Sequence, residues 1–535
     1  MTASTDLSAP SALVAPAPAH SVSNGKVRSA ADRVDRLSSV ALAVAFAVVA
    51  VASLAAPVRR TGDAQQYVAM AAALGHGQPP SLTPSEVTAF KQWMAAQPAA
   101  SGYPDAQAAI DQGNLRVDGR QEFSHFWVYP LVAAPFVRLA EAMNLPLGVG
   151  FTITNLVLLG IAFAFIARVT HPSVALFLLA SPLVWFVSKA QVETFTVALI
   201  GVAACLMLRG DALLAGLAVA VAATQNLPLA AGVGLCWLLA LAEQLRRRRP
   251  ETGTLPVNSR TRAVAIVAAT IAVVAMHPAY YLWRLGVVTP QELNNGFGIR
   301  VPGWERSLAV LVDPGIGLLP FMPALAAFGL WGTIRVLVSG PAEPVIDRRR
   351  AAALWAALLA AWLLFVFAQT TNVNSGGTIW VSRYALWLLP LALPLLAAVA
   401  ASRPGSVTLA AAAVVSLPLS LIVFDPALPE RYVTPSPQSA WLNDALPGWY
   451  HQPAELFYER AHATDGGVRG SAASPGCQTV LVAVIDRTQP CQLTAPELAA
   501  VDALLADGWD SAWVTRGGTT GFGRAEVVGA ERAGS

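Results

Sequence analysis

Long runs of apolar residues alternate with short polar segments along most of the chain. Most runs approach the roughly 20 residues that a helix needs to cross a hydrocarbon core of about 30 Å, so the pattern predicts membrane-spanning helices. We expect spans in these eleven runs: 37–56, 147–167, 172–188, 191–208, 211–224, 227–245, 263–283, 314–338, 351–369, 384–401 and 406–424. The sequence therefore predicts an all-α polytopic membrane protein.

A further apolar run, 124–143, decides the orientation of all the others. If it is left out of the count and the N-terminus is cytoplasmic, every basic cluster between spans falls inside, as the positive-inside rule requires. These clusters are Arg168 with His171, Arg209, Arg246–Arg249 with Arg260 and Arg262, Arg335 with Arg348–Arg350, and Arg403. Counting 124–143 as a span would place all of them outside. We therefore expect 124–143 to form an interfacial helix on the outer face. We keep the short run 211–224 as a span, because without it the basic clusters would no longer all fall on the cytoplasmic side.

The two ends of the chain depart from the apolar pattern. Residues 1–37 are rich in Ala, Ser and Pro and have no apolar period, which predicts a disordered cytoplasmic tail. Residues 425–535 are richer in Pro, Gly and charge. Within them 479–485 has the pattern of a buried strand, and 494–497 has the capping box of a helix that continues to Leu505. We expect a small α+β domain, placed outside by the odd number of spans.

The four cysteines fall into two pairs. Cys477 and Cys491 flank the predicted strand of the C-terminal domain and the turn that follows it. If this domain lies outside, it is in an oxidising compartment, so we predict a disulfide between them. Cys205 and Cys236 fall in apolar runs, and we expect both to be buried and free.

A carboxylate stands at the outer end of the first span. The stretch 61–67 brings Asp63 to the membrane face and opens a helix over 67–74, at the start of a first outer loop, 59–145. A second helix is predicted over 81–97, beginning at the segment 83–86. Polar side chains from other inter-span segments return to the same face.

Composition narrows the function classes. The chain has 535 residues, of which 55% are hydrophobic and 13% charged, and its net charge is +3. Nothing in this balance indicates a nucleic-acid partner. No His, Cys, Asp and Glu cluster has the spacing of metal ligands, and no glycine-rich phosphate loop is present.

Four polar segments occur in an order that resembles a known family. They are Gly62-Asp63-Ala64-Gln65-Gln66-Tyr67, His125-Phe126-Trp127-Val128-Tyr129-Pro130, Lys189-Ala190-Gln191-Val192-Glu193 and Trp380-Val381-Ser382-Arg383-Tyr384. With Asp313-Pro314-Gly315-Ile316-Gly317, they resemble the GT-C superfamily of membrane glycosyltransferases over about 38–424. The topology is similar to that of the bacterial aminoarabinose transferases that act on lipid A and of the protein O-mannosyltransferases.

The resemblance implies a function and a place. It implies transfer of a sugar from a polyprenyl-phosphate donor to a lipid, glycan or protein acceptor at the periplasmic face of a bacterial inner membrane. Many relatives carry two acidic residues together in the first loop, where this chain has Asp63-Ala64. No cofactor is expected, although this departure leaves the use of a divalent metal open.

The implied chemistry needs a base for the acceptor hydroxyl and cations for the leaving phosphate. Asp63 is the expected catalytic base, and Arg383 is the first candidate for the phosphate because it stands outside, at the mouth of a span. The other expected substrate-binding residues are Gln66, Tyr67, His125, Tyr129, Glu193, Arg300, Arg306 and Tyr384.

Structural alternatives remain for the acidic and basic candidates. Asp63 followed by Gln66 fits a capping box, in which the carboxylate only holds a helix start. Arg383 fits an interfacial anchor equally well. Lys189 and Glu193 are four residues apart, and pairing with each other on a helix is the favoured interpretation. Arg300 and Arg306 are expected to be solvated.

Two other function classes also stay open. A transporter or flippase of lipid-linked saccharides would favour internal symmetry and ionisable residues near mid-span, whereas the charges here lie at the ends of the spans. The other class is a non-catalytic membrane scaffold. Such a protein does not need the polar side chains that gather at one face of this chain, so this gathering argues mildly against it.

Overall fold

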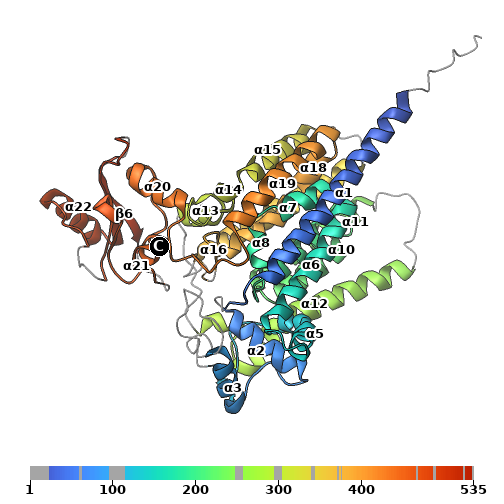
Figure 1. Ribbon diagram of the computed structural model, residues 1–535, viewed down its shortest axis with the longest axis horizontal. Helices are drawn as coiled ribbons and strands as arrows, with labels where there is room; N and C mark the ends of the chain where they lie inside the picture. Colours follow the sequence, from blue (N-terminus) through green and yellow to red (C-terminus); the bar gives the residue numbers. More distant parts are fainter. Residues whose placement is uncertain are drawn as a thin grey trace, which may run out of the picture.

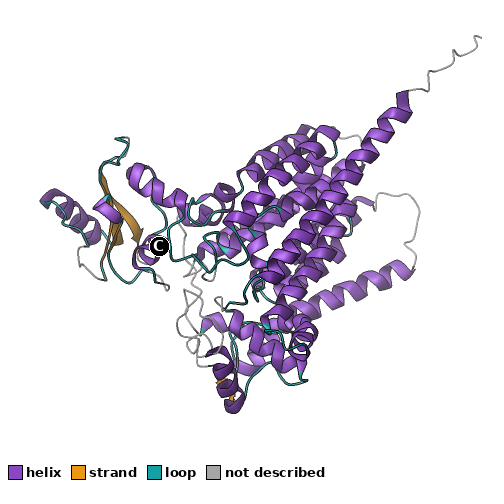
Figure 2. Cartoon of the chain, viewed as in Figure 1, coloured by secondary structure: helices purple, strands orange, loops and turns teal. Residues whose placement is uncertain are grey.

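The protein is mostly helical, with one small sheet near its C-terminus (Figure 2). The computed structural model describes residues 23–59, 63–95, 115–247, 257–293, 304–338, 344–369, 373–374, 376, 378–464, 468–485, 490–521 and 524–532. Up to residue 424 its helices are α1 (Ser23–Ala55), α2 (Ala64–Gly75), α3 (Pro84–Ala95), α5 (Val128–Ala142), α6 (Gly148–Val169), α7 (Pro172–Leu179), α8 (Leu183–Phe186), α9 (Glu193–Arg209), α10 (Ala212–Ala223), η1 (Leu227–Leu229), α11 (Ala230–Arg247), α12 (Val257–Leu285), η2 (Pro290–Glu292), α13 (Trp304–Val312), α14 (Leu318–Phe321), α15 (Pro323–Val338), α16 (Pro344–Gln369), α17 (Arg383–Leu388), η3 (Leu389–Ala392), α18 (Leu393–Ala400) and α19 (Arg403–Val423).

Seven helical stretches in the described part of the chain are long and apolar enough to cross a membrane. They are Asp35–Ala55, Gly148–Val169, Leu227–Leu245, Arg260–Leu285, Arg348–Gln369, Arg383–Ala400 and Arg403–Val423. Four of the eleven expected spans fall on shorter helices: 172–188 on α7 and α8, 191–208 on α9, 211–224 on α10, and 314–338 on α14 and α15. The count of eleven therefore stays a prediction at these four runs.

Prolines divide two of the expected spans. The run 172–188 breaks between α7 and α8, where Pro182 precedes the second helix, and the run 314–338 breaks before Pro323, the first residue of α15. Proline lacks the N–H that an inner helical turn requires and is best accommodated at a helix start. At 1.5 Å per residue, the eight residues of α7 rise only about 12 Å, so α7 is far shorter than a hydrocarbon core.

Helix α7 lies inside the bundle. It packs against α1, α6, α18 and α19, and the side chains from Val174 to Leu179 are at most 3% exposed. In Figure 1 the long helices α1, α6 and α19 run near it in the same bundle. Its continuous apolar sequence therefore reflects burial on all sides rather than lipid contact.

Helix α1 begins at Ser23, so the expected disordered tail is wrong over residues 23–37. The segment contains Lys26, Arg28, Ala30 and Ala31, residue types of high helix propensity, which favours extension of the helix beyond the apolar run. The extension is also tied to the bundle, because Asp35 Oδ1 lies 2.8 Å from His171 Nε2. Residues 1–22 lie outside the described part of the chain.

The first outer loop forms a compact unit of α2, α3, α5 and a two-stranded hairpin, β1 (Arg116–Val117) with β2 (Arg120–Gln121). The expected helices over 67–74 and 81–97 are confirmed as α2 and α3. The expected interfacial helix is α5, whose 15 residues rise about 22 Å, less than a hydrocarbon core. Helix α5 packs on α2 and α6, which fixes the unit to one end of the bundle.

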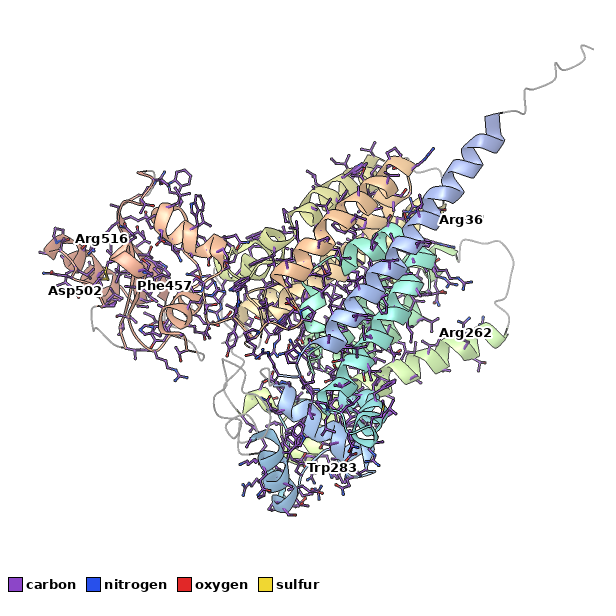
Figure 3. The ribbon with its side chains drawn as sticks, viewed as in Figure 1. Arg36, Arg262, Trp283, Phe457, Asp502 and Arg516 are labelled. Atoms are coloured by element: carbon purple, nitrogen blue, oxygen red, sulfur yellow. A yellow bond between two sulfur atoms is a disulfide. The ribbon has the colours of Figure 1, made fainter. Side chains whose placement is uncertain are left out.

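Figure 3 relates this unit to the ends of two long helices. Arg36 on α1 and Arg262 on α12 lie on the side of the view away from α2 and α3, whereas Trp283, near the other end of α12, lies beside them. Tyr281 at the same end of α12 donates from its hydroxyl to the Phe123 carbonyl at 3.2 Å. The first outer loop therefore sits where α1 and α12 end.

The C-terminal region carries the expected α+β domain. It contains α20 (Pro437–Ala445), η4 (Pro447–Trp449), α21 (Ala454–His462), β3 (Ala472–Ala473), η5 (Pro475–Cys477), β4 (Thr479–Ala483), α22 (Ala495–Ala506), β5 (Trp509–Thr515) and β6 (Glu526–Arg532). The strands form an antiparallel sheet in the order β3-β4-β5-β6. The predicted strand is β4, the predicted helix is α22 with its capping box between Thr494 and Glu497, and the Cys477–Cys491 disulfide is present. Cys205 and Cys236 are buried and free, as expected.

Buried polar contacts join this domain to the helical bundle. The carboxylate of Asp313 accepts from the Tyr450 hydroxyl at 2.6 Å, and Arg460 Nη2 donates to the Gly315 carbonyl at 3.0 Å. Arg306 Nη2 on α13 pairs with Glu455 Oε2 at 2.9 Å. The Asp313-Pro314-Gly315 turn, one of the segments that carries the family resemblance, thus forms part of the surface on which the C-terminal domain docks.

Candidate functional site

Asp63 sits at the start of α2 but does not cap it. The residue occupies the N-cap position, and its side chain makes no capping hydrogen bond. Its Oδ2 instead accepts from Arg383 Nη1 at 2.8 Å and lies 3.2 Å from His125 Nε2. The capping-box alternative is therefore wrong, because the carboxylate is drawn to two cation-forming side chains rather than to the helix backbone.

The charge environment of Asp63 favours its ionised form. Burial alone would raise the pKa of this carboxyl, but the charges of His125 and Arg383, together with their hydrogen bonds, hold that pKa far below its ordinary value. The side chain is 17% exposed. Asp63 is thus a carboxylate at neutral pH, and its side chain is mostly buried.

His125 links Asp63 to the adjacent helical turn. Its Nε2 faces Asp63, and its Nδ1 lies 3.0 Å from Gln66 Oε1. Ser124 Oγ donates to the same Gln66 oxygen at 3.1 Å. The imidazole is therefore oriented through both ring nitrogens, and Gln66 acts as its support.

Arg383 is held between two carboxylates. Besides Asp63, its Nε lies 3.9 Å from Glu193 Oε1, and its guanidinium lies over the Tyr384 ring with the central carbon 5.8 Å from the ring centre. The plane of Tyr384 is stacked in turn on Phe367, 4.8 Å away. A side chain fixed on three sides has a defined direction, and a planar guanidinium suits a forked contact to an oxyanion.

The turn before Arg383 is strained. Trp380 has φ of +66°, a left-handed backbone conformation that is costly for a bulky residue. The turn is fixed by a hydrogen bond from Ser382 N to the Ile316 carbonyl at 3.0 Å, and the Ser382 side chain accepts from Tyr384 N. This strained turn sets the direction in which α17 starts and so the direction of Arg383.

Glu193 begins α9 and is completely buried. Neither of its carboxylate oxygens has a hydrogen-bond partner among the described residues, and Arg383 is its cationic neighbour. The favoured pairing with Lys189 is wrong, since the chain forms a turn between the two residues and helical spacing starts only at Glu193. Lys189 Nζ donates instead to the Pro426 carbonyl at 2.7 Å.

Two tyrosines form the wall behind Asp63 and His125. The ring centres of Tyr67 and His125 are 5.0 Å apart, and those of Tyr67 and Tyr129 are 5.7 Å apart. Burial, with Asp63 nearby, raises the pKa of Tyr67 well above its ordinary value, so Tyr67 stays neutral. Tyr129 donates from its hydroxyl to Asn155 Oδ1 at 2.9 Å. These residues shape the site without adding charge.

The structure thus brings together most of the expected site residues. Asp63, Gln66, Tyr67, His125, Tyr129, Glu193, Arg383 and Tyr384 are connected through the contacts above. Arg306 belongs instead to the docking surface of the C-terminal domain, and it is half-buried and paired with Glu455 rather than solvated. Arg300 lies outside the described residues.

Asn155 is a site residue that sequence reasoning missed. It lies on the apolar helix α6, is fully buried, accepts from Tyr129, and donates through Nδ2 to the Lys189 carbonyl at 2.9 Å. It thereby connects α5 to the turn that precedes Glu193. The signal that could have identified it is an isolated amide within a membrane-length apolar run.

The acidic side chains of the site lie among the residues that the structure describes. Among these residues, no group of three or more His, Cys, Asp and Glu side chains is arranged to hold a metal ion. Asp63 and Glu193 are instead separated by the guanidinium of Arg383. The carboxylates of the site therefore surround an organic cation.

Comparison with known proteins does not assign the chain to a family. No model of a protein family matches the chain, and no curated protein matches its sequence significantly.

Proposed function

We propose that this protein is an integral-membrane glycosyltransferase that moves a sugar from a polyprenyl-phosphate donor to an acceptor hydroxyl. The observation that carries the proposal is the contact between Asp63 and Arg383, which are 320 positions apart in the sequence. One residue is a carboxylate able to accept a proton, and the other is a guanidinium able to bind a phosphate. Their contact puts both functions required for glycosyl transfer in one place.

The proposed reaction uses the two groups in sequence. The donor phosphate binds Arg383, and the charge of Arg383 is then shared between the phosphate and Asp63. Because the nearby positive charge is part of what lowers the pKa of Asp63, binding of the phosphate raises that pKa and makes the carboxylate a stronger base. The acceptor oxygen attacks the sugar carbon, its proton passes to Asp63, and the bond to phosphate breaks with the electron pair on the phosphate oxygen.

His125 and Glu193 hold this arrangement. His125 helps to orient Asp63 by contacting Oδ2, the same oxygen that Arg383 contacts, and Glu193 keeps the guanidinium from leaving the site when the donor carries its phosphate in. The buried carboxyl group of Glu193 has no hydrogen-bond partner among the described residues, and burial of such a group is costly. A costly buried group of this kind is typical of a functional rather than a stabilising position.

The proposed location is the periplasmic face of a bacterial inner membrane, with the N-terminus cytoplasmic and the C-terminal domain periplasmic. Seven helical stretches of membrane-crossing length and the placement of basic residues support this orientation. The Cys477–Cys491 disulfide supports an oxidising compartment for the C-terminal domain. The acceptor is a lipid, a glycan or a protein.

The test is incorporation of radiolabelled sugar from a panel of polyprenyl-phosphate donors by membranes with and without the protein. We expect one donor to yield a labelled product only when the protein is present. Equal labelling with and without the protein for every donor would contradict the proposal.

A further inference from the structure

His125 reaches Asp63 from a short segment, residues 121–125, which follows strand β2 and leads toward α5. After Gln121 the chain has no regular secondary structure until α5 begins at Val128. No helical turn or strand pairing therefore sets the position of the His125 imidazole, whose Nε2 lies 3.2 Å from Asp63 Oδ2. That position depends on contacts with other elements.

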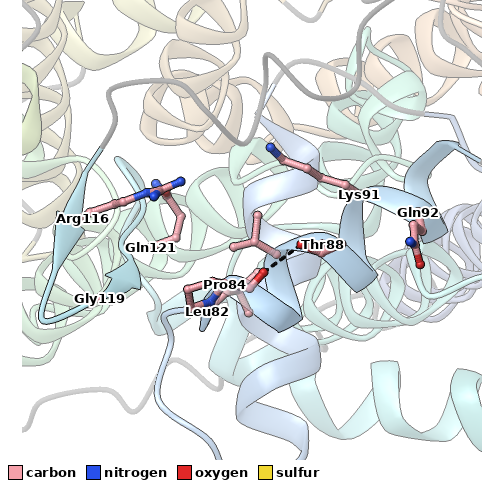
Figure 4. Close-up of a pocket in the computed structure, with 9 residues that line it drawn as sticks. Leu82, Pro84, Thr88, Lys91, Gln92, Arg116, Gly119 and Gln121 are labelled. Carbon is pink, nitrogen blue, oxygen red and sulfur yellow. Dashed lines mark hydrogen bonds between the residues drawn. The ribbon is translucent and has the colours of Figure 1, made fainter.

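One side of the segment is tied to α3. Gln121 and Leu82, which lies just before α3, exchange backbone hydrogen bonds of 3.0 and 2.7 Å. Arg120 Nε, in the same hairpin, donates to Ser81 Oγ at 2.8 Å. Figure 4 shows Gln121 on the hairpin and Leu82 beside the start of α3. The hairpin thus fixes the beginning of the segment.

The other side of the segment is held by α12 through a buried ion pair. The side chain of Glu122 is 1% exposed. Its Oε1 accepts from Arg284 Nε and Nη2 at 2.9 and 2.6 Å, and its Oε2 accepts from the Tyr280 hydroxyl at 2.7 Å. Because hydrogen bonds between charged groups are roughly twice as strong as neutral ones, Glu122 is a firm anchor shortly before His125.

Helix α12 also contacts the chain on both sides of His125. The Tyr281 hydroxyl donates to the Phe123 carbonyl at 3.2 Å, and the ring centres of Phe126 and His277 are 5.0 Å apart. Among the described helices and strands, α12 otherwise packs mainly on α10. The outer end of α12 and the segment that carries His125 therefore depend on each other for their positions.

Arg284 has a second acidic partner, which differs from Glu122 in its exposure. Arg284 Nη1 lies 3.0 Å from Asp118 Oδ2, and the side chain of Asp118 is 78% exposed. Solvent weakens an exposed ion pair, whereas removal of one partner of a buried pair leaves an uncompensated charge. Loss of the Glu122 charge should therefore disturb the segment, and loss of the Asp118 charge should not.

We propose that Glu122 and Arg284 are positioning residues that hold His125 against Asp63. They act through the backbone of residues 121–125, which their ion pair joins to α12. The effect of this positioning on sugar transfer rests on the proposed function. The placement of His125 itself does not, so it can be measured without any substrate.

The first test observes His125 by NMR in the purified full-length protein labelled with ¹³C-histidine. The chain has seven histidines, and His125→Gln identifies the signal of His125. Glu122→Gln keeps the size of the side chain but removes its charge, and Arg284→Lys keeps the charge but loses the paired contact. We expect both variants to shift or broaden the His125 signal, Glu122→Gln more than Arg284→Lys, whereas Asp118→Asn should leave it unchanged.

The His171 signal is the control for folding, since His171 contacts Asp35 of α1 and belongs to another part of the bundle. It should be the same in all these variants and in the wild type. An unchanged His125 signal in Glu122→Gln and Arg284→Lys would overturn the proposal, as would an equal change in Asp118→Asn.

The second test separates positioning from a purely structural role. It measures transfer per folded protein from the polyprenyl-phosphate sugar that the donor panel identifies. The donor phosphate is assigned to Arg383 on a different element, α17, so Glu122→Gln should lower the maximal rate about tenfold and change the donor concentration for half-maximal rate by less than about twofold. Asp118→Asn should keep the wild-type rate.

A double variant shows whether Glu122 acts through His125 and Asp63. Residues that act as a unit are not additive, so Glu122→Gln should cause no further loss of rate in an Asp63→Asn background. The same further loss in both backgrounds would contradict the proposal. If no donor of the panel supports transfer, the proposed function fails, while the histidine signals still decide whether Glu122 and Arg284 place His125.

Discussion

At the scale of single residues, Arg383 contacts two carboxylates that come from distant parts of the chain. It contacts Asp63 at 2.8 Å and Glu193 at 3.9 Å, and it is only 17% exposed. An anchor for lipid headgroups would place its guanidinium in the interface, free of such partners. The contacts of Arg383 instead favour a role in the site.

Replacement of Arg383 should affect use of the donor before it affects folding. A hydrogen bond between charged groups contributes about 1.5–3 kcal/mol, so Arg383→Ala should raise the donor concentration needed for half-maximal transfer by about ten- to a hundredfold. Arg383→Lys keeps the charge but loses the fork and should fall between the wild type and Arg383→Ala. Transfer measured against donor concentration checks this, with Arg138→Ala as a matched loss of an arginine outside the site. The same donor dependence in Arg383→Ala and wild type would leave only an anchoring role.

At the scale of elements, the docking of α21 against the bundle depends on a buried carboxylate. Glu455 is 4% exposed at its side chain and pairs with Arg306 at 2.9 Å. Its Oε1 also accepts from Asn374 N at 3.2 Å. Burial raises the pKa of Glu455 to about 8, with Glu459 adding to the rise and Arg306 opposing it.

This raised pKa makes docking sensitive to pH. The unfolded pKa of a glutamate is about 4.3, so between that pH and about 8 the folded protein holds a proton that the unfolded chain has released. Stability is therefore fully present below the unfolded pKa and is lost as the pH rises through the folded one. We expect the unfolding temperature of the wild type to fall from pH 5 to pH 9 relative to that of Glu455→Gln.

The control for this experiment is Glu141→Gln, which changes an exposed carboxylate on α5. It should retain the wild-type pH dependence. Parallel curves for wild type and Glu455→Gln would show that Glu455 does not carry the effect.

Elements with a local signal were predictable, and those fixed by packing were not. The capping box of Thr494 and Glu497 identified α22, and the apolar run at 479–485 identified β4, because both signals lie within a few residues. The burial of α7 on all sides and the contact between Asp35 of α1 and His171 depend instead on how the helices pack against one another. Apolar runs alone do not separate a lipid-facing helix from one buried on all sides.

The same limit applies to the site. Asp63 and Arg383 could each be nominated from their positions at the ends of apolar runs. That they touch depends on how α2 and α17 pack, which no local pattern encodes. Asn155 and the Asp313 docking turn likewise acquire their roles from partners that are remote in sequence.

At the scale of the whole molecule, the proposed orientation places the first outer loop and the C-terminal domain on the periplasmic side. Ser85 on α3 and Asp502 on α22 are exposed, as is Arg260 near the start of α12. Single cysteines introduced at these three positions, with Cys205 and Cys236 replaced, report the side of the membrane. We expect an impermeant maleimide to label Ser85→Cys and Asp502→Cys in intact cells and to label Arg260→Cys only after permeabilisation. Labelling of Arg260→Cys in intact cells would contradict this orientation.

The central claim for the molecule is that Asp63 is the base in a glycosyl transfer. Asn at this position keeps an oxygen for Arg383, and the helix start is unaffected because the Asp63 side chain does not cap α2. Asp63→Asn should therefore insert and fold as the wild type does. Asp118→Asn removes another carboxylate of the same outer loop and serves as the matched control.

The most direct measurement is the rate of sugar transfer by Asp63→Asn in proteoliposomes with saturating donor. We expect that rate to fall by about 10²-fold or more, the scale of the loss of a general base, while Asp118→Asn stays near the wild-type rate. A rate for Asp63→Asn close to that of the wild type would remove Asp63 from the mechanism.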